Sequence, residues 1–261
     1  MALPPNLENA PSSKSSNDAL ADAGGPTSAP LLKFYFLTLF PETFAPVLNS
    51  SLMGKAQKRG IVSFQPVQIR DFATDKHHTV DDTPYGGGEG MLMKVDVLHA
   101  AWKSVQPQAG EVGKTVTLLL SPQGRHFDQA MAKDLAGYSR LILVCGHYEG
   151  VDERFIELCV DQEVSIGDYV LTGGELPAMV MADTVTRLLP GVVGNELSLT
   201  QDSLEGDLIK YPQYTRPREY EGLKVPEVLL GGDHGAIAGW RRRQMEERTA
   251  RKRPDLIKTR T

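Results

Sequence analysis

Cysteine is scarce in this sequence of 261 residues, which contains only Cys145 and Cys159. Two cysteines cannot build the disulfide framework that stabilises many small secreted proteins, and such scarcity is typical of a reducing compartment. Both lie in apolar stretches, so we expect them to be buried, reduced and chemically inert. Hydrophobic residues make up 41% and charged residues 23% of the chain, proportions that exclude wholesale disorder.

Long apolar runs are also missing, and no stretch approaches the roughly 18 apolar residues that a membrane-spanning helix needs. The most apolar candidate, residues 171–189, is interrupted by Glu175, Asp183 and Arg187. Residues 1–30 have neither the apolar segment of a secretory signal nor the arginine enrichment of a transit peptide. We therefore predict a disordered tail over 1–30, no membrane association and a cytoplasmic protein.

Several familiar ligand-binding fingerprints are absent. The Gly113-Lys114-Thr115 triplet imitates the end of a phosphate loop, but Gln108 stands where that loop needs its first glycine. The glycine cluster at 86–90 lacks the spacing of a dinucleotide-binding loop, which argues against a nicotinamide-dependent oxidoreductase. The histidines show no metal-ligand spacing, and no Gly-x-Ser-x-Gly nucleophile elbow occurs, so we assign no metal ligands.

A repeated order of strand, polar loop and helix runs through the middle of the sequence. Three polar loops, at 121–124, 146–150 and 172–174, each follow an apolar stretch and precede a helical pattern. This order predicts an α/β fold with a parallel sheet and helices on its faces. Ligands of such sheets bind outside the carboxyl ends of the strands, where all three loops lie. The expected strands span 34–40, 61–69, 115–120, 140–145 and 164–171, and the expected helices span 41–58, 95–105, 127–135, 151–160 and 175–189.

The three loops carry few charged groups, and their glycines let a ligand approach the backbone closely because glycine has no Cβ atom. Such loops suit a ligand that is read by its base edge and ribose. A triphosphate would instead call for lysine and a helix N-terminus. The residues alone leave two interpretations open: a site for a nucleoside-containing cofactor, or three tight turns of an α/β domain.

Positive charge is in the minority, since 28 Lys and Arg face 33 Asp and Glu and the net charge is −5. The C-terminal end is nevertheless basic, because residues 240–261 hold seven Arg and two Lys against two Glu and one Asp, a net +6. A helical pattern spans 235–252, and we place a small second domain after about residue 200. The basic end is either a surface for nucleic-acid phosphates or a solvated helix with arginine on one face.

Two long motifs stand out, CGHYEGVDER at 145–154 and SIGDYVLTGGELPAM at 165–179. Together with stretches at 85–93, 121–124, 183–194, 202–203 and 214–217, they resemble the bacterial tRNA (guanine-N1)-methyltransferase family of the SPOUT class. The resemblance covers roughly residues 32–257 in the family's order, and it implies S-adenosylmethionine as methyl donor and methylation of guanine N1 at position 37 of tRNA. It also implies a SPOUT-type parallel sheet with a deep trefoil knot, a small helical C-terminal domain and a homodimer.

The implied domains follow the same order along the chain. After the tail at 1–30, a knotted α/β domain that binds S-adenosylmethionine spans 31–194. An interdomain catalytic loop then spans 195–214, and a helical tRNA-binding domain spans 215–261. We expect this basic last domain to contact tRNA phosphates.

The resemblance assigns the chemistry to three residues. Guanine N1 carries a proton, so a base must remove it as the methyl group arrives, while negative charge develops towards O6. By resemblance Asp202 is that base and Arg187 stabilises the charge, while Glu149 faces the methyl-transfer region, where the family is thought to use a magnesium ion. Structural alternatives stay open: Asp202 as the N-cap of a helix over 203–208, Arg187 as the i,i+4 ion-pair partner of Asp183, and Glu149 as an acid favoured by a helix dipole.

The implied cofactor site is built from the three loops and from the strand ends that precede them. A cationic sulfonium needs no neutralising lysine, which agrees with the lack of one in these loops. The implied cofactor-binding residues are Leu119, Ser121, Pro122, Gly146, Tyr148, Glu149, Gly150, Ile166, Gly167, Asp168, Tyr169, Val170, Leu171, Gly173 and Gly174.

The sequence departs from the family pattern at three positions. His147 stands where many relatives carry Arg, Glu89 where Pro is usual, and Lys210 replaces a common acidic residue. His147 changes the local charge, and Lys210 changes the loop contacts that the family pattern implies. Two other functions stay open, a SPOUT methyltransferase that acts on another RNA and a non-catalytic RNA-binding module. The presence of both Asp202 and Arg187 speaks against the second.

Overall fold

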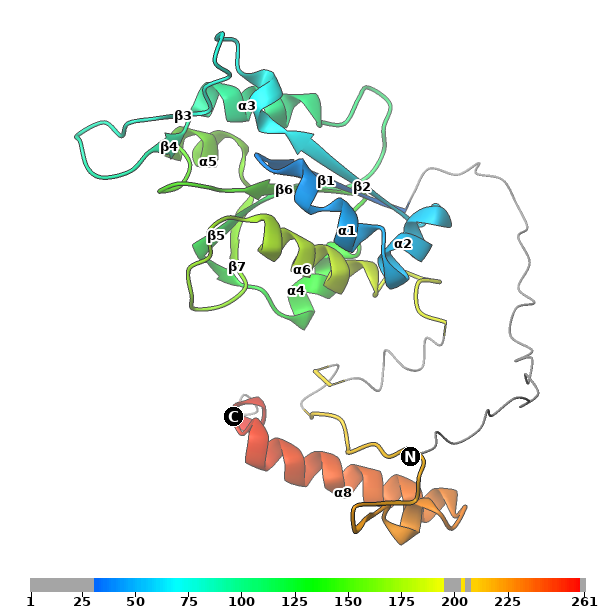
Figure 1. Cartoon of the computed structure of the whole chain (residues 1–261). Coiled ribbons are helices and arrows are strands. Elements are labelled where there is room, and N and C mark those ends of the chain that lie inside the picture. Colours follow the sequence, from blue (N-terminus) through cyan, green and yellow to red (C-terminus); the bar gives the residue numbers. More distant parts are fainter. Residues whose placement is uncertain (1–30, 195–202, 205–207, 259–261) are drawn as a thin grey trace, which may run out of the picture.

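A five-stranded parallel sheet forms the centre of the molecule (Figure 1). The computed structural model describes residues 31–194, 203–204 and 208–258, so the tail predicted at 1–30 lies outside the description. Each strand pairs in parallel with its neighbours, which confirms the α/β prediction. In spatial order the strands are β2 (Val62–Gln68), β1 (Leu32–Thr38), β6 (Arg140–Cys145), β5 (Thr115–His126) and β7 (Gln162–Ser165).

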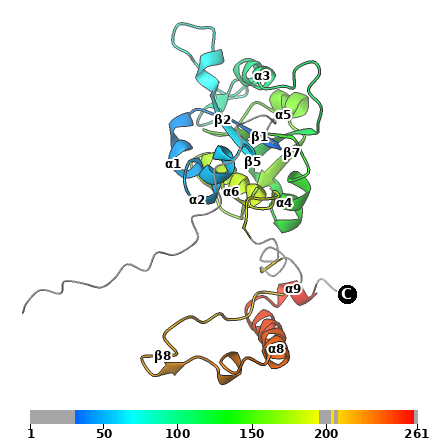
Figure 2. The ribbon, with the colours of Figure 1, turned by 90° about the vertical axis from the view of Figure 1, so that its right-hand side faces the viewer.

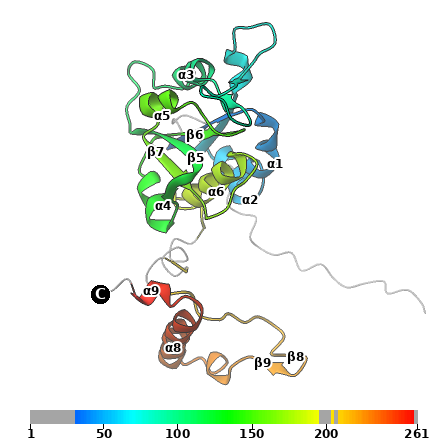
Figure 3. The same cartoon turned by 90° about the vertical axis from the view of Figure 1, so that its left-hand side faces the viewer.

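Helices cover both faces of the sheet, as Figures 2 and 3 show from opposite sides. One face carries α3 (Val95–Ser104) and α5 (Glu153–Cys159), which pack on each other. The opposite face carries α1 (Ala45–Leu48), α2 (Ser51–Lys58), α4 (Gln129–Leu135) and α6 (Glu175–Thr186). The helices predicted at 95–105, 127–135, 151–160 and 175–189 are therefore confirmed, with ends that differ by a few residues.

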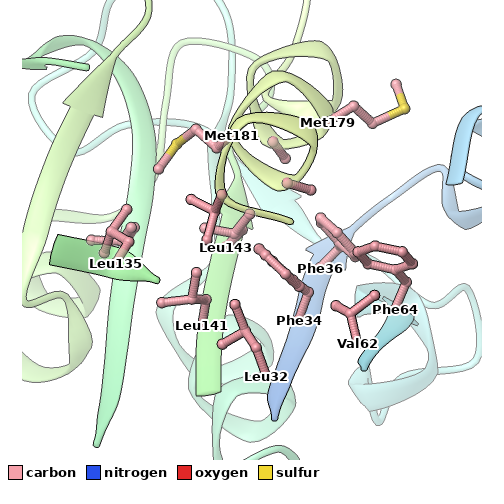
Figure 4. Close-up of a cluster of buried hydrophobic side chains, with 14 of the residues drawn as sticks. Leu32, Phe34, Phe36, Val62, Phe64, Leu135, Leu141, Leu143, Met179 and Met181 are labelled. Atoms are coloured by element: carbon pink, nitrogen blue, oxygen red, sulfur yellow. The ribbon is translucent and has the colours of Figure 1, made fainter. Parts of the chain in front are cut away.

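Side chains along the central strands alternate between two hydrophobic cores, one under each helical layer. In β6, Leu141 and Leu143 belong to the core beneath α6, whereas Ile142 and Val144 belong to the core beneath α3. Figure 4 shows Leu141 and Leu143 beside the methionines of α6. Because both faces are buried, β6 is a continuous apolar run without the polar alternation of a half-exposed strand. That run is the reason the sequence located the strand correctly.

The helix predicted over 41–58 is wrong in its continuity. The chain forms a 3-10 turn, η1 (Pro41–Thr43), then α1, and starts α2 afresh at Ser51, whose φ is +48°. The Ser50 hydroxyl donates to the Val47 carbonyl at 2.8 Å, a local bond that competes with continued helix. The break lets Phe44, which is fully buried, pack its ring beside the strands.

The boundary between strand and loop at the end of β5 also differs from the prediction. Residues 121–124, predicted as a loop, lie inside β5, which continues to His126. Leu120 and Arg125 both pair with Val164 of β7, so the residues between them bulge out of the regular ladder. Conversely, the strand predicted at 164–171 ends at Ser165, whose hydroxyl donates to the carbonyl of Gly167 at 3.0 Å.

The segment after β7 returns across the sheet to the end of β6. The backbone N–H of Gly174 donates to the carbonyl of Gly146 at 3.1 Å. A Cβ atom on Gly174 would lie 2.6 Å from Cys145 Cα, so only glycine permits this approach. Because β5 separates β6 from β7 in the sheet, this connection brings together two loops whose strands are not neighbours. Helix α6 starts at this junction.

The C-terminal part consists of short elements and one long helix. The hairpin of β8 (Glu219–Tyr220) and β9 (Leu223–Lys224) precedes η3 (Glu227–Leu229), α8 (His234–Lys252) and α9 (Asp255–Lys258). The helix predicted at 235–252 is confirmed, and the Asp233 side chain caps it by accepting from Ala236 N–H at 3.0 Å. Among the described residues, we find no helix whose length and apolar character would let it cross a bilayer.

Candidate functional site

A cavity of about 580 Å³ lies at the carboxyl ends of β5, β6 and β7. Its walls are three segments: 119–123 within β5, 146–151 after β6, and the stretch from 163 to 174 that leaves β7. This is the edge of a parallel sheet where ligands bind, and the volume is that of a small-molecule site. The return of the chain from β7 to Gly146 is what closes the third wall.

The cavity gathers nearly all of the residues implied as cofactor-binding. Asp168 is the exception, because it is exposed in the same loop and does not line the cavity. The others that line it are Leu119, Ser121, Pro122, Gly146, Tyr148, Glu149, Gly150, Ile166, Gly167, Tyr169, Val170, Leu171, Gly173 and Gly174. Their place in one cavity supports a common ligand, and their individual roles stay predictions.

Sequence reasoning missed several lining residues. Gln123 and Thr172 lie within the motifs that carry the resemblance, so continuing each assignment by one or two positions would have found them. Glu163 precedes the expected strand and carried no such signal. His147 was noted as a departure in charge, whereas the structure places it in the cavity wall.

The loop after β6 is held in shape by the chain that precedes α3. The carbonyl of Met91 accepts from Glu149 N–H at 3.0 Å, and the carbonyl of Gly150 accepts from Met93 N–H at 3.0 Å. Tyr148, the residue before Glu149, adopts a φ of +60°, which is rare for a residue with a side chain. The N–H of Gly150 donates to the carbonyl of His147 at 3.1 Å and closes a turn around Tyr148, whose half-exposed side chain lines the cavity.

A buried carboxylate supports the same loop from below. Glu175, the first residue of α6, accepts from the Thr38 hydroxyl at 2.6 Å and lies 2.8 Å from Nε2 of His147. The Thr38 hydroxyl in turn accepts from Phe40 N–H at 2.9 Å, and the Phe40 ring meets the edge of the His147 ring. This network joins β1, the loop after β6 and α6. The His147 ring is thereby fixed at the rim of the cavity.

Cys145 ends β6 directly beneath the cavity and is fully buried. Burial raises the pKa of its thiol well above the ordinary value, and the negative charge of Glu175 raises it further. Since the nucleophile is the thiolate, Cys145 stays protonated and inert at neutral pH. The sequence prediction of buried, free cysteines is confirmed for Cys145 and Cys159. The cavity therefore offers no thiol nucleophile at this position.

The charged side chains that line the cavity are acidic. Glu149, Glu153 and Glu163 line it, and no Lys or Arg does so among the residues that the structure describes. Three carboxylates without a basic partner favour a cation and disfavour a polyphosphate. The glycine backbones of the walls offer N–H and C=O groups for the remainder of a ligand.

Of the three implied catalytic residues, Glu149 lines this cavity and Arg187 lies away from it in a single chain. Arg187 caps the C-terminal end of α6, whereas Gly174 caps the end that faces the cavity. Gly174 and Arg187 flank the 12 residues of α6, which places these caps about 20 Å apart at ~1.5 Å per residue. Asp183 is exposed one turn before Arg187, so the ion-pair alternative stays open. Asp202 lies outside the described residues.

The residues around Asp202 are described only in part. The Ser203 hydroxyl accepts from Lys210 N–H at 2.9 Å, which ties this turn to the chain that leads into the C-terminal part. The helix predicted over 203–208 includes residues 205–207, which the structure leaves undescribed, so the N-cap alternative for Asp202 stays a prediction. Lys210, one of the family departures, is thus placed beside this turn.

Metal-binding side chains do not gather within the described part of the chain. No group of three or more His, Cys, Asp or Glu side chains able to hold a metal ion occurs there. Glu149 is exposed at the mouth of the cavity and supplies one carboxylate. The described residues therefore do not form a ligand set for magnesium.

The basic C-terminal end lies on α8 and the residues that follow it. Arg242 pairs with Glu246 at 2.5 Å, one turn along the helix. Arg243 and Arg251 are exposed. The structure thus contains one element of the solvated-helix alternative, an i,i+4 pair, together with exposed arginines that suit phosphate contacts.

Comparison with known proteins gives a consistent result. Residues 32–259 match the family model described as tRNA (Guanine-1)-methyltransferase TrmD. A tRNA (guanine-N(1)-)-methyltransferase from Pelotomaculum thermopropionicum is 54% identical over 228 residues, which cover 87% of this chain and 90% of that protein. Proteins with the same name from Carboxydothermus hydrogenoformans and Ruminiclostridium cellulolyticum are 51% and 52% identical, over 88% and 96% of their own lengths.

Proposed function

Because this chain belongs to the tRNA (guanine-1)-methyltransferase family, whose relatives are enzymes that methylate guanine N1 of tRNA, we propose that it transfers a methyl group from S-adenosylmethionine to N1 of guanosine 37. The observation that carries the proposal is the acidic, glycine-walled cavity at the carboxyl ends of β5, β6 and β7. It suits a cationic nucleoside better than a phosphorylated one.

The cavity fits S-adenosylmethionine on the chemistry of its walls. Gly173 and Gly174 leave no room for side chains, since a Cβ atom would lie 2.3 Å from the His147 ring at Gly173 and 2.6 Å from Cys145 Cα at Gly174. Without Cβ atoms, the backbone there lets the edge of a base and a ribose approach closely. When bound, S-adenosylmethionine supplies an electrophilic methyl group on a sulfonium. The carboxylates of Glu149 and Glu163 hold negative charge at the cavity that receives it.

Side chains of the protein remove the N1 proton of the guanine and stabilise the charge that results. We assign the removal of the N1 proton to Asp202, because a neutral guanine is a poor nucleophile at that nitrogen. Arg187 stabilises the negative charge that develops at O6, as a cation fixed at the end of a helix is suited to do. Glu149 orients the region of methyl transfer. The described residues offer no magnesium site, and this mechanism routes no step through one.

We propose a homodimer in which Asp202 and Arg187 of one chain serve the cavity of the other. The separation of about 20 Å between the two caps of α6 supports this, since one chain leaves its own cavity without the arginine. Leu176 and Val180 on α6 and Val170 in the cavity wall are exposed apolar side chains. A second subunit would cover such a surface.

The trefoil knot belongs to the same proposal. It is supported by the return of the segment after β7 across β5 to Gly146, after which α6 continues on the face that also carries α2.

We further expect the enzyme to act in the cytoplasm, where its tRNA substrate is found. A SPOUT methyltransferase with another RNA substrate is the competing function, and a non-catalytic RNA-binding module is the weaker one.

Mass spectrometry of nucleosides tests the proposal. Unmodified tRNA incubated with the protein and S-adenosylmethionine should gain N1-methylguanosine, and a transcript with adenosine at position 37 should gain none. Asp202→Ala should lower the rate by about 10²–10⁴-fold, as loss of a general base does, while S-adenosylmethionine binding is nearly unchanged.

The matched control for this test is Asp207→Ala, which removes a carboxylate from the same loop. It should keep most of the wild-type rate. Methylation at another nucleoside would favour the competing SPOUT function, and no methylation at all would favour the RNA-binding module. An Asp202→Ala protein with more than about a tenth of the wild-type turnover would remove Asp202 from the role of base.

A further inference from the structure

A second hollow, of about 210 Å³, lies in the C-terminal part and is separate from the cavity of the sheet. One wall is the extended segment 211–214, which enters the C-terminal part. The other wall is the first half of α8, with η3 at the end. The lining residues that matter for its chemistry are Tyr211, Gln213, Tyr214, Trp240 and Arg241.

Flat π-systems dominate this hollow. The ring centroids of Tyr214 and Trp240 are 6.4 Å apart and the ring planes are tilted by 52°. The Arg241 guanidinium lies over the ring of Tyr211, 4.7 Å from its centroid. The Tyr214 side chain is 49% exposed, so one surface of the pair remains open to a ligand. Aromatic surfaces and a planar cation at one place are the features that bind unpaired nucleobases.

Polar groups in the wall narrow the class of ligand. Gln213, which is exposed, carries an amide that both donates and accepts, as the edge of a base requires. Arg241 offers planar donors to a base edge or a phosphate while it stays stacked on Tyr211. An apolar peptide segment would leave these polar groups without partners. Arg243, which is exposed two positions after Arg241 on α8, supplies positive charge that an RNA backbone needs.

We propose that this hollow binds one unpaired base of the RNA substrate, stacked on Tyr214 beside Trp240 and held at its edge by Arg241. The inference rests on the proposed function for the nature of the substrate. The base is a neighbour of the target guanine in the same single-stranded loop. The hollow begins nine positions after Asp202, at Tyr211, and extended chain of that length reaches at most about 30 Å.

The two tryptophans of the chain permit a direct test. Trp102 lies on α3 and donates its Nε1–H to Thr117 at 2.9 Å, away from the C-terminal part. In a Trp102→Phe protein the only indole is Trp240. Addition of an anticodon stem-loop RNA should quench its fluorescence. Replacing each unpaired loop base in turn by an abasic nucleotide should abolish most of the quenching at one position, and should weaken binding there by about 5- to 100-fold.

A matched pair of tyrosine variants localises the effect. Tyr214→Leu keeps an apolar side chain but removes the stacking surface, and should weaken RNA binding to a similar degree. Tyr214→Phe should bind almost as well as the wild type. Tyr220→Leu is the control, because Tyr220 is an exposed tyrosine of β8 that does not line the hollow. S-Adenosylmethionine binding should be the same in all three proteins, which verifies that they are folded.

The outcome separates this inference from the proposed function. A stem-loop that carries adenosine at the methylated position measures binding without methyl transfer, so stacking is read even if the assigned reaction proves wrong. Equal quenching by every abasic RNA would overturn the inference, as would wild-type affinity in Tyr214→Leu. Quenching that rises with protein concentration in the absence of RNA would assign the hollow to a second copy of the chain and would also overturn it.

Discussion

Glu175 is the residue on which the geometry of the cavity rim depends most. Its carboxylate is 8% exposed and holds a hydroxyl of β1 and the ring of His147 at once. A buried acceptor with two partners is costly to remove, because each partner loses its bond without regaining water. These contacts explain why α6, whose first residue is Glu175, begins beside β1 and the loop after β6.

We expect Glu175→Gln to weaken S-adenosylmethionine binding by about 10- to 100-fold, the equivalent of one hydrogen bond to a charged group. The amide can still accept from Thr38, but its NH₂ group faces the His147 ring and the charge is lost. Isothermal titration of the cofactor measures the effect. Glu157→Gln, an exposed change on α5, is the control and should bind normally.

The outcome at the residue scale also marks what sequence could predict. The motifs around Gly146 and Gly173 led to the right cavity, because loops that follow parallel strands meet at one edge. The sequence could not predict the partner of His147. His147 and Glu175 are 28 positions apart, and they meet only because the chain returns across β5. Unchanged cofactor affinity in Glu175→Gln would mean that the contact between Glu175 and His147 does not shape the cofactor site.

At the scale of elements, apolar runs located the strands reliably, whereas the residues that interrupt a strand or a helix were not predicted. Strand β6, buried on both faces, was predicted to the residue, and β1 was predicted two residues too late at each end. The bulge in β5 was missed because Ser-Pro-Gln-Gly is typical of a turn, whereas pairing with β7 resumes at Arg125. The break between α1 and α2 was missed because it depends on the burial of Phe44 among the rings of the strands.

Helix α8 gives a prediction at the same scale. Reversing Arg243 and Arg251 to Glu should weaken tRNA binding and lower the log–log salt slope by at least about 1.4–1.8, since each phosphate contact contributes about 0.7–0.9. The preference for guanosine at the methylated position should be unchanged, because phosphate contacts position the RNA and base contacts specify it. Binding titrations at several salt concentrations provide both quantities.

The control for α8 is the double reversal of Lys76 and Lys103, exposed lysines of the sheet domain, which changes the net charge equally. It should leave the slope close to that of the wild type. If the two double variants behave alike, the effect is one of overall charge. If neither alters the slope, α8 is a solvated helix whose arginines pair with Glu246 and its neighbours.

At the scale of the whole molecule, the distance between the two ends of α6 makes a prediction about assembly. An Asp202→Ala chain should complement a Gly173→Val chain, whose added side chain would displace the His147 ring from the cavity wall. Each homodimer should be nearly inactive, and the mixture should regain methyl transfer. The reason is that a heterodimer has one intact cavity facing one intact Asp202.

Subunit exchange has to be verified for this experiment, for example by native mass spectrometry of differently tagged chains. Full exchange without recovered activity would contradict a site shared between subunits. Activity of a homogeneous monomer fraction would contradict it as well. The sequence could not supply this geometry, because the length of α6 bears on the site only once Gly174 is known to lie at the cavity.

The order of strands in the sheet has a consequence for how the protein is made. Strand β1 pairs with β6, in which Arg140 lies opposite Lys33. Strand β1 is therefore synthesised long before this neighbour in the sheet. At about 5–20 residues per second, the nascent chain spends several seconds with the apolar Leu32, Phe34 and Phe36 lacking that partner. Distant parallel pairing is also intrinsically slow to form. The topology therefore leaves an apolar strand edge open during translation, and slowing the ribosome before residue 140 would lengthen that period.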